Sequence, residues 1–331
     1  MTKKMPPYIA HIRKVGGDPQ SLEEHLFGVA EIAKRLAAKI SLEPQGELIG
    51  LLHDLGKYSN EFQVYLKSAV GLINQDEDEF VDARGLKGKV DHSTAGAQLV
   101  WEELSKQGNI GSIVGQVLSL CIASHHSGLI DCLSSDTRGP IEDNFTRRIS
   151  KSESKTHIQE VMTKLDVSIE KRFRELVDDS GLIDNFKQSI RQLALREGGT
   201  DQSPAVRFKI GLLVRLLFSC LIDADRTNTA DFESPKAAKN RLNGRYVHWD
   251  VLIERLEQHL RSFGTTNQID KIRGQISDHC RDSASRAKGI YTLTVPTGGW
   301  KDSRQSPLRI APCQEVGNGS DHLYRAVHDN H

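Results

Sequence analysis

The stretch Leu51-Leu-His-Asp-Leu-Gly-Lys57 places two adjacent polar side chains, His53 and Asp54, at the end of an apolar segment. The segment predicts a helix that stops near Gly56, because glycine commonly terminates helices. Adjacent helical positions differ by about 100° in azimuth, so both side chains can converge on metal ions over the helix edge. Asp54 would bridge two ions and His53 would bind one. A lone His-Asp pair is more typical of an ordinary helix end, so a metal site needs partners elsewhere.

Such partners lie in or beside other apolar helices, where an unpaired polar group costs free energy. They are His25, His92, His125, His126 and Asp225. Each alone is typical of a hydrogen-bonded core residue, but a shared metal site satisfies all of them together. Imidazole with carboxylate is the ligand set of Mn, Fe, Co, Ni or Zn, whereas all-oxygen sets suit Mg and Ca.

The remaining sequence predicts an all-α protein. The capping box Ser21-x-x-Glu24 opens a first helix that ends near Ile40. Residues 204–225 are the most apolar segment and predict a buried central helix, while 74–89 and 127–140 predict loops. Only Gly289–Val295 alternates like a strand. Further helices are expected at residues 60–70, 92–105, 112–125, 158–177, 182–195, 250–263 and 269–288.

Composition excludes several classes of protein. The 331 residues carry no formal net charge, which argues against a basic protein that coats nucleic acid. The longest apolar stretch, Ile210–Ile222, is short and contains Arg215, so no membrane span is expected. The five cysteines show no C-x-x-C spacing, and the N-terminus has no apolar core typical of a secretory signal. We therefore expect a cytoplasmic protein.

The chemistry that such a site suits is phosphodiester hydrolysis. Two metal ions about 3.5–4 Å apart can bind the scissile phosphate and activate water. Lys57 follows His53 at i+4, where it can contact the phosphate or stabilise developing charge. A solvated lysine at a helix C-terminus is an equally good interpretation. Any DNA path must be a local basic strip, for which the candidates are Arg147, Arg148, Lys151, Arg207, Lys209 and Arg215.

The joint pattern resembles the HD superfamily of metal-dependent phosphohydrolases. It is most similar to the HD nuclease domain of the CRISPR-associated nuclease-helicase of type I systems, over roughly residues 8–300. The matching segments are SLEEH, LLHDLGKYSNEFQVYL, DHSTAGA, ASHHSG, SCLIDADRTNT and YTLTVPTGG. The resemblance implies a helical bundle with a dinuclear metal site. The implied ligands of the first ion are His25, His53, Asp54 and Asp225, with Asp223 as a competitor for Asp225. Those of the second are Asp54, His92, His125 and His126.

The resemblance also implies a domain organisation. It places an HD nuclease domain at residues 1–245, a helical linker at 246–288 and the truncated, degenerate start of a helicase at 289–331. Val295–Gly299 resembles the start of a phosphate-binding loop. That loop needs a glycine before its lysine and Ser or Thr after it, whereas this chain has Trp300-Lys301-Asp302. We therefore expect no ATP binding, no unwinding and an aberrant tail.

Three functions remain open at this level. The first is a metal-dependent nuclease, acting mainly on single-stranded DNA in type I CRISPR interference, without a working motor. It would use two divalent ions, transition metals or possibly Mg, and could dock on the crRNA-guided surveillance complex. The second is an HD-type nucleotide or cyclic-dinucleotide phosphohydrolase, against which the helicase-like segment Thr292–Gly299 argues. The third is a non-catalytic truncated product.

Overall fold

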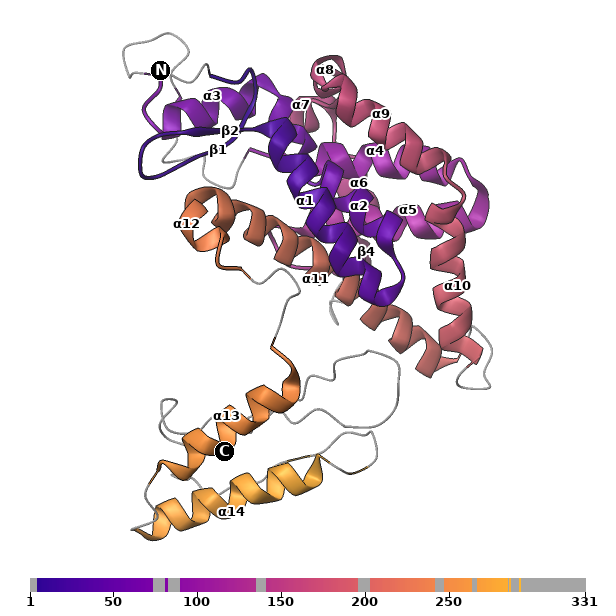
Figure 1. Ribbon diagram of the computed structural model, residues 1–331. Helices are drawn as coiled ribbons and strands as arrows, with labels where there is room; N and C mark the ends of the chain where they lie inside the picture. The colour runs from indigo at the N-terminus through magenta and orange to yellow at the C-terminus, as the bar shows by residue number, and fades with distance from the viewer. Residues whose placement is uncertain are drawn as a thin grey trace. The chain divides into compact units, whose positions relative to one another are not determined.

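The computed structural model describes residues 5–73, 81–82, 90–134, 141–195, 203–241, 247–263, 267–284, 286 and 292. The regular secondary structure of these residues is helical apart from two two-stranded antiparallel ribbons, which confirms the predicted all-α class (Figure 1). The chain divides into two compact units, Met1–Asn240 and Arg241–His331. Apart from Thr292, the strand expected at 289–295, the phosphate-loop-like segment and the tail lie outside the described residues, so those expectations stay predictions.

The first unit contains most of the described secondary structure. Its strands are β1 (Ile9–Ile12), β2 (Pro19–Ser21), β3 (Leu133–Ser134) and β4 (Glu142–Asp143). Its longer helices are α1 (Leu22–Ala37), α2 (Glu43–Leu52), α3 (Asn60–Ala69), α4 (Thr94–Ser105), α5 (Gly108–Ser124), α9 (Val167–Asp178), α10 (Gly181–Leu195) and α11 (Pro204–Glu233). Its short helices are η1 (Ala38–Ile40), η2 (Leu55–Tyr58), α6 (Asn144–Ile149), α7 (Glu153–Thr156), α8 (Ile158–Lys164) and α12 (Pro235–Ala238).

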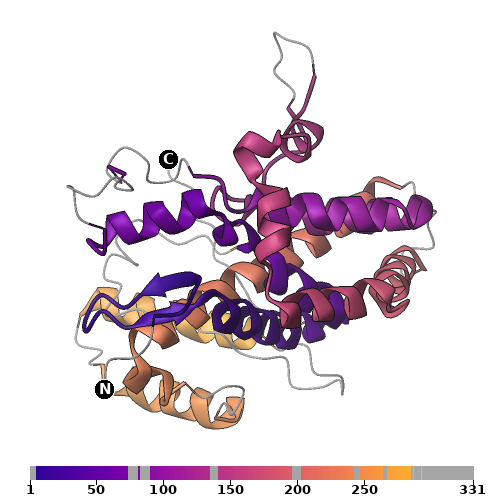
Figure 2. The same ribbon diagram turned by 90° about the horizontal axis from the view of Figure 1, so that it is seen from above.

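Helix α1 begins as predicted, because the Ser21 hydroxyl caps it by accepting from the Glu24 amide at 3.1 Å. Its apolar stripe packs against α2 and α11, and the three helices share one hydrophobic core (Figures 1 and 2). Leu22, Leu26 and Val29 are fully buried on this stripe. The site described below lies at one end of this packing, where α1, α2 and α11 meet α4 and α5.

The N-terminal hairpin of β1 and β2 was not predicted, so the expectation that no segment other than 289–295 forms a strand was wrong. Its register pairs Ile9 with Ser21 and His11 with Gln20. The Gln63 side chain on α3 accepts from the Ile9 amide and donates to the Ile9 carbonyl, both at 3.0 Å. The hairpin therefore depends on a distant partner, which a local sequence pattern does not show. The loop expected at 127–140 is likewise interrupted by β3, which pairs with β4.

Helix α11 differs from its prediction in length and burial. It continues to Glu233, and it buries only one face, on which Leu217 and Leu221 are inaccessible. On the opposite face Phe208 is 68% exposed and Leu216 is 51% exposed. The expectation of a buried central helix therefore holds for one face of α11 and not for the other. Both faces are apolar in the N-terminal half of α11, so the sequence does not indicate which face the core covers.

In the described part of the second unit the chain forms two helices, α13 (Trp249–Arg261) and α14 (Gln268–Ser283). Both were predicted, although α14 ends before the expected residue 288. Arg281 on α14 lies 3.8 Å from the Glu257 carboxylate on α13, and the Asn267 side chain caps α14. None of the helices that the structure describes combines the length and apolar character that a membrane crossing requires.

A close backbone approach brings α4 against the end of α2. A Cβ atom added at Gly96 would lie 2.0 Å from the Leu52 carbonyl oxygen, so only glycine fits at this crossing. Nearby, the Gly56 amide donates to the His92 carbonyl at 3.0 Å. These contacts hold the segment around His92 beside the His53-Asp54 pair.

We expect Gly96→Ala to lower the free energy of unfolding by about 1–3 kcal/mol, because the new methyl group would overlap a backbone oxygen that cannot move alone. The matched control is Gly211→Ala, at an exposed position in α11 with no atom within 4 Å of the added Cβ. That exchange should stabilise the helix by about 0.5–1 kcal/mol. Chemical denaturation measures both variants. Equal stabilities for the two would contradict the tight crossing.

Candidate metal centre

The structure gathers the selected histidines and carboxylates around Asp54, which is 2% exposed. The side chains come from five places in the chain: α1, the turn after α2, the segment before α4, the end of α5, and α11. In that order they are His25, the pair His53 and Asp54, His92, the pair His125 and His126, and Asp225. Segments up to two hundred residues apart thus contribute to one site, as the sequence analysis expected; their role as metal ligands stays a proposal.

One carboxylate oxygen of Asp54 faces the first cluster. Asp54 Oδ2 lies 3.3 Å from both His25 Nε2 and His53 Nε2. Asp225 Oδ1 lies 3.5 Å from the same nitrogen of His25 and 3.6 Å from that of His53. Asp223, the competing candidate, is exposed, so Asp225 is the carboxylate that the structure brings to this cluster.

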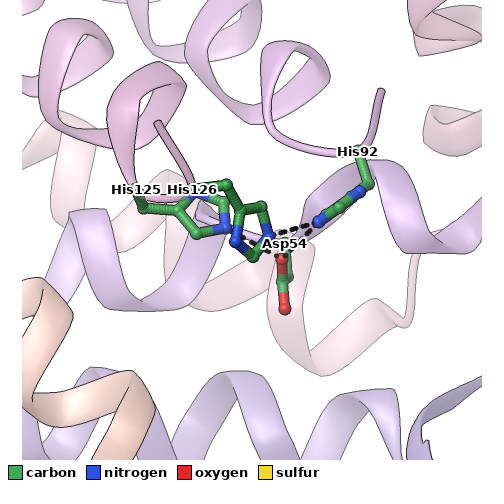
Figure 3. Close-up of side chains that lie close together, drawn as sticks. All are labelled: Asp54, His92, His125 and His126. Atoms are coloured by element: carbon green, nitrogen blue, oxygen red, sulfur yellow. Dashed lines mark hydrogen bonds and ion pairs between the residues drawn. The ribbon is translucent and has the colours of Figure 1, made fainter. Parts of the chain in front are cut away.

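The other oxygen of Asp54 faces a second cluster, in which the side chains point toward one another (Figure 3). Asp54 Oδ1 lies 3.3 Å from His125 Nε2 and 3.6 Å from His92 Nε2. His126 Nε2 lies 2.5 Å from His92 Nε2. Asp54 therefore stands between two groups of potential ligands.

Backbone carbonyl oxygens set the tautomer of three of these imidazoles. Nδ1 lies 2.9 Å from the Gly50 oxygen in His53, 3.1 Å from the Val90 oxygen in His92 and 2.8 Å from the Ile122 oxygen in His125. A carbonyl oxygen can only accept, so Nδ1 carries the hydrogen in each ring. In the neutral ring the lone pair then lies on Nε2, which faces Asp54, as in histidines that ligate a metal.

The polar atoms at the centre lack hydrogen-bond partners. Nε2 of His25, His53 and His125 and Oδ1 of Asp54 are buried without one. A buried unsatisfied polar atom costs about 1–3 kcal/mol, so four gathered at the Asp54 carboxylate require an explanation. Ligands about 2.1 Å from one ion lie about 3.0–3.4 Å apart, close to the separations observed here. Divalent ions on the two sides of Asp54 would satisfy these atoms, and the residues therefore fit a dinuclear centre.

Charges inside the site reinforce one another. Burial alone would raise the pKa of the Asp54 carboxyl, but Lys57 and His53 outweigh it and hold that pKa well below its usual range. Burial also opposes the charged form of His53, yet Asp54 and Asp225 raise its pKa to about 10. In the metal-free protein His53 is therefore an imidazolium. Its proton occupies the place that a metal ion would take.

Other histidines of the site are neutral at physiological pH. Burial is the main cause that lowers the pKa of His92 to about 4. The residue His126 is exposed, but its ring packs against those of His92 and His125, and this loss of hydration lowers its pKa to about 3. Burial likewise lowers the pKa of His25. A neutral imidazole needs no proton loss before it binds a cation, so these three side chains are ready as ligands.

Lys57 is not the solvated lysine that the sequence left as an alternative. It is 4% exposed, and its Nζ lies 2.7 Å from Asp54 Oδ2 and 3.3 Å from the Ala10 carbonyl oxygen. The geometric reason is that α2 ends at Leu52 and η2 winds more tightly, so Lys57 folds back onto Asp54. Its position beside the site suits charge stabilisation, and its catalytic role stays a prediction.

Two neighbours of the site were missed in the sequence. The His11 ring on β1 packs edge-on against His25 with ring centroids 4.8 Å apart, and His11 can offer a nitrogen to a group with His25 and Asp54. Asn228 Oδ1 lies 2.9 Å from His25 Nδ1. The signal for Asn228 was its spacing, since it follows Asp225 at i+3 on the same helix face. Nothing local marks His11, because the unpredicted hairpin carries it.

Arg148 and Lys151, two of the basic residues considered for a DNA path, bond to residues beside the site. Lys151 Nζ lies 2.5 Å from Asp91 Oδ2, and Arg148 Nη2 donates to the Ser93 hydroxyl at 2.9 Å and to the Ala123 carbonyl at 3.1 Å. These bonds tie the segment of His92 to the end of α5. Arg148 and Lys151 thus support the site, and a DNA path along the remaining candidates stays a prediction.

Comparison with known families supports the resemblance read from the motifs. Residues 46–192 match the family described as Cas3, HD domain. The matched segment contains the His53-Asp54 pair, Lys57 and all ligands of the second cluster, whereas His25 and Asp225 lie outside it. HD domains bind divalent metal ions, in agreement with the two clusters. No curated protein matches the chain.

Adding Mn²⁺ to the metal-free protein should raise its unfolding temperature. A free ion concentration one hundred times the Kd corresponds to about 2.7 kcal/mol of added stability. Asp225→Asn should weaken this gain, because it removes a charged oxygen from the first cluster. Asp223→Asn is the matched control and should respond like the wild type. Differential scanning fluorimetry across a Mn²⁺ series tests both; an identical gain in the two variants would contradict the assignment.

Metal binding should weaken as pH falls from about 8 to about 6, since the ion must displace the His53 proton. The His53 pKa is raised above the unfolded value of 6.5 to about 10. Its proton therefore stabilises the metal-free fold fully below pH 6.5, and that stabilisation is lost as pH rises through about 10. Calorimetric titration with Mn²⁺ in buffers of different ionisation enthalpy measures the proton release. Binding without it would refute this charge assignment.

Proposed function

We propose that this chain, which carries an HD nuclease domain of the Cas3 type, is a metal-dependent nuclease that hydrolyses phosphodiester bonds of single-stranded DNA in type I CRISPR interference. The observation that supports this proposal most strongly is the division of ligands by Asp54. Its two oxygens face separate clusters of histidines, each completed by further ligand atoms.

The proposed ligands follow from that division. His25, His53, Asp54 and Asp225 would hold one divalent ion, and Asp54, His92, His125 and His126 the other. When bound, such a pair supplies Lewis acidity toward a phosphodiester and a hydroxide from water. The protein's own part is positional: hydrogen bonds to Nδ1 fix three imidazoles, and burial holds Asp54 between the clusters.

Charge balance favours an anionic substrate. Two carboxylates face two proposed dications, and Lys57 adds a positive charge 2.7 Å from Asp54 Oδ2. The loaded centre is therefore net positive, which suits the phosphate backbone of DNA. His126 is exposed, so the second cluster is the side of the centre that a polymer can reach. Within this proposal Lys57 limits the negative charge that Asp54 presents to the phosphate.

The same centre could hydrolyse a nucleotide or a cyclic dinucleotide, and this remains the competing outcome. The family match favours a nucleic acid, because it is to an HD domain of the Cas3 type. Docking on the crRNA-guided surveillance complex and the lack of a working motor belong to the proposal as well. The lack of a motor rests on Trp300-Lys301-Asp302, which stand where a phosphate-binding loop needs glycine before the lysine and Ser or Thr after it.

The protein should cut circular single-stranded DNA in the presence of Mn²⁺ or Co²⁺, and a chelator should stop the reaction. Asp54→Asn should lower the rate by at least about 10²-fold, because both clusters lose their shared charge. Asp223→Asn, at an exposed position on α11, should cut at the wild-type rate. A parallel panel of nucleotides and cyclic dinucleotides tests the competing function. DNA left intact by metal-loaded protein, or cutting by Asp54→Asn at the wild-type rate, would contradict the proposal.

A further inference from the structure

His25 differs from the other buried imidazoles in the partner of its Nδ1 atom. His53, His92 and His125 each use a backbone carbonyl of a nearby residue. His25 uses instead the side-chain oxygen of Asn228, at 2.9 Å and 203 residues away in the chain. The orientation of this ring therefore depends on a side chain from another helix.

The amide of Asn228 is itself held in place. Asn228 Oδ1 also accepts from Gln20 Nε2 on β2, at 3.0 Å. Because the Gln20 amide nitrogen can only donate, the Asn228 atom that it contacts is the amide oxygen, and the same oxygen faces His25 Nδ1. A Cβ atom added at Gly28 on α1 would lie 2.2 Å from Asn228 Nδ2, so the glycine leaves room for the amide against α1.

The C-terminal end of α11, which follows Asn228, contacts the N-terminal hairpin. Arg13 Nε donates to the Phe232 carbonyl at 3.0 Å, and the Lys14 amide donates to the Glu233 carboxylate at 3.2 Å. Thr229 Oγ1 lies 3.4 Å from His11 Nε2. These contacts join the hairpin to the last turns of α11, which directly follow Asn228.

Among the described residues, Asn228 Oδ1 is the atom that bonds to His25 Nδ1. The His25 side chain is fully buried, so water does not replace a lost acceptor. On its other side Nε2 lies 3.3 Å from Asp54 Oδ2 and 3.5 Å from Asp225 Oδ1. If the hydrogen moved to Nε2, it would point at these oxygens and occupy the direction in which an ion would bind. The acceptor at Nδ1 thus decides whether His25 can act as a ligand.

We propose that Asn228 is a positioning residue, which holds His25 in the Nδ1–H tautomer and aims its Nε2 lone pair at the first of the two clusters. Asn228 does not contact the reacting groups; it acts through His25. Helix α11 would then supply both a ligand, Asp225, and the orienting partner of another ligand, one turn apart. The statement about metal affinity rests on the proposed function, whereas the statement about the tautomer does not.

The test compares Asn228→Ala, which removes the acceptor, with Asn228→Asp, which keeps an oxygen in its place. Asn60→Ala is the matched control, because it makes the same exchange at an exposed position outside the site. In metal-free protein, the ¹⁵N shifts of the histidine side chains report the tautomer, with the His25 signals identified by their loss in His25→Gln. Titration with Mn²⁺ then reports the affinity for each ion.

We expect wild type, Asn60→Ala and Asn228→Asp to hold His25 as the Nδ1–H tautomer, and Asn228→Ala to lose this preference. Asn228→Ala should bind one of two ions about 10–100-fold more weakly and leave the other unchanged. Asn228→Asp should bind both ions at least as tightly as wild type, since a carboxylate partner raises imidazole basicity. This variant carries the test if Asn228→Ala does not fold.

An unchanged tautomer and unchanged affinities in Asn228→Ala would overturn the proposal. The proposal would also be overturned if Asn228→Asp folds but holds His25 in the other tautomer or binds one of the ions more weakly than wild type. Failure of the proposed function gives a different result: the wild type then binds no ion or cuts no DNA. In that case the ¹⁵N shifts of metal-free protein still decide whether Asn228 orients His25.

Discussion

The arrangement of this protein depends on one buried carboxylate, that of Asp54. A charge removed from water costs several kcal/mol unless partners surround it, and losing one partner of a buried ion pair costs about 3–5 kcal/mol. Here Lys57 and His53 supply positive charge, and the buried Nε2 atoms of His25 and His125 face the same carboxylate without hydrogen-bond partners. The metal-free centre is thus an incomplete set of ligands, and two cations on either side of Asp54 would complete it.

Helix ends explain how the ligands are aimed. The last carbonyl oxygens of a helix have no intrahelical donor. His53 follows α2 and His125 follows α5, and each bonds its Nδ1–H to the carbonyl three residues earlier, Gly50 or Ile122. The same bond that satisfies a helix end therefore fixes a tautomer. His25 sits inside α1, where the carbonyls are already used, and so it needs an acceptor from another helix, Asn228.

Many features of the fold and of the site were predictable because they depend on residues close together in the sequence. The Ser21 cap, the helix after it and the histidines and carboxylates at helix ends follow from short-range pattern and from the cost of burying polar groups. The hairpin at Ile9–Ile12 was not predictable in this way, since Gln63 holds it from 54 residues away. The exposed face of α11 and the fold-back of Lys57 were missed for related reasons: both depend on what packs nearby, not on periodicity. His11 entered the site through the hairpin and was missed with it.

The most direct measurement is anomalous diffraction from crystals grown with Mn²⁺. It should show two peaks about 3.5–4 Å apart with the Asp54 carboxylate between them. One peak should lie among His25, His53 and Asp225, and the other among His92, His125 and His126. No peak at Asp54 under conditions that saturate binding, or ions bound only at other residues, would contradict a dinuclear centre in this protein.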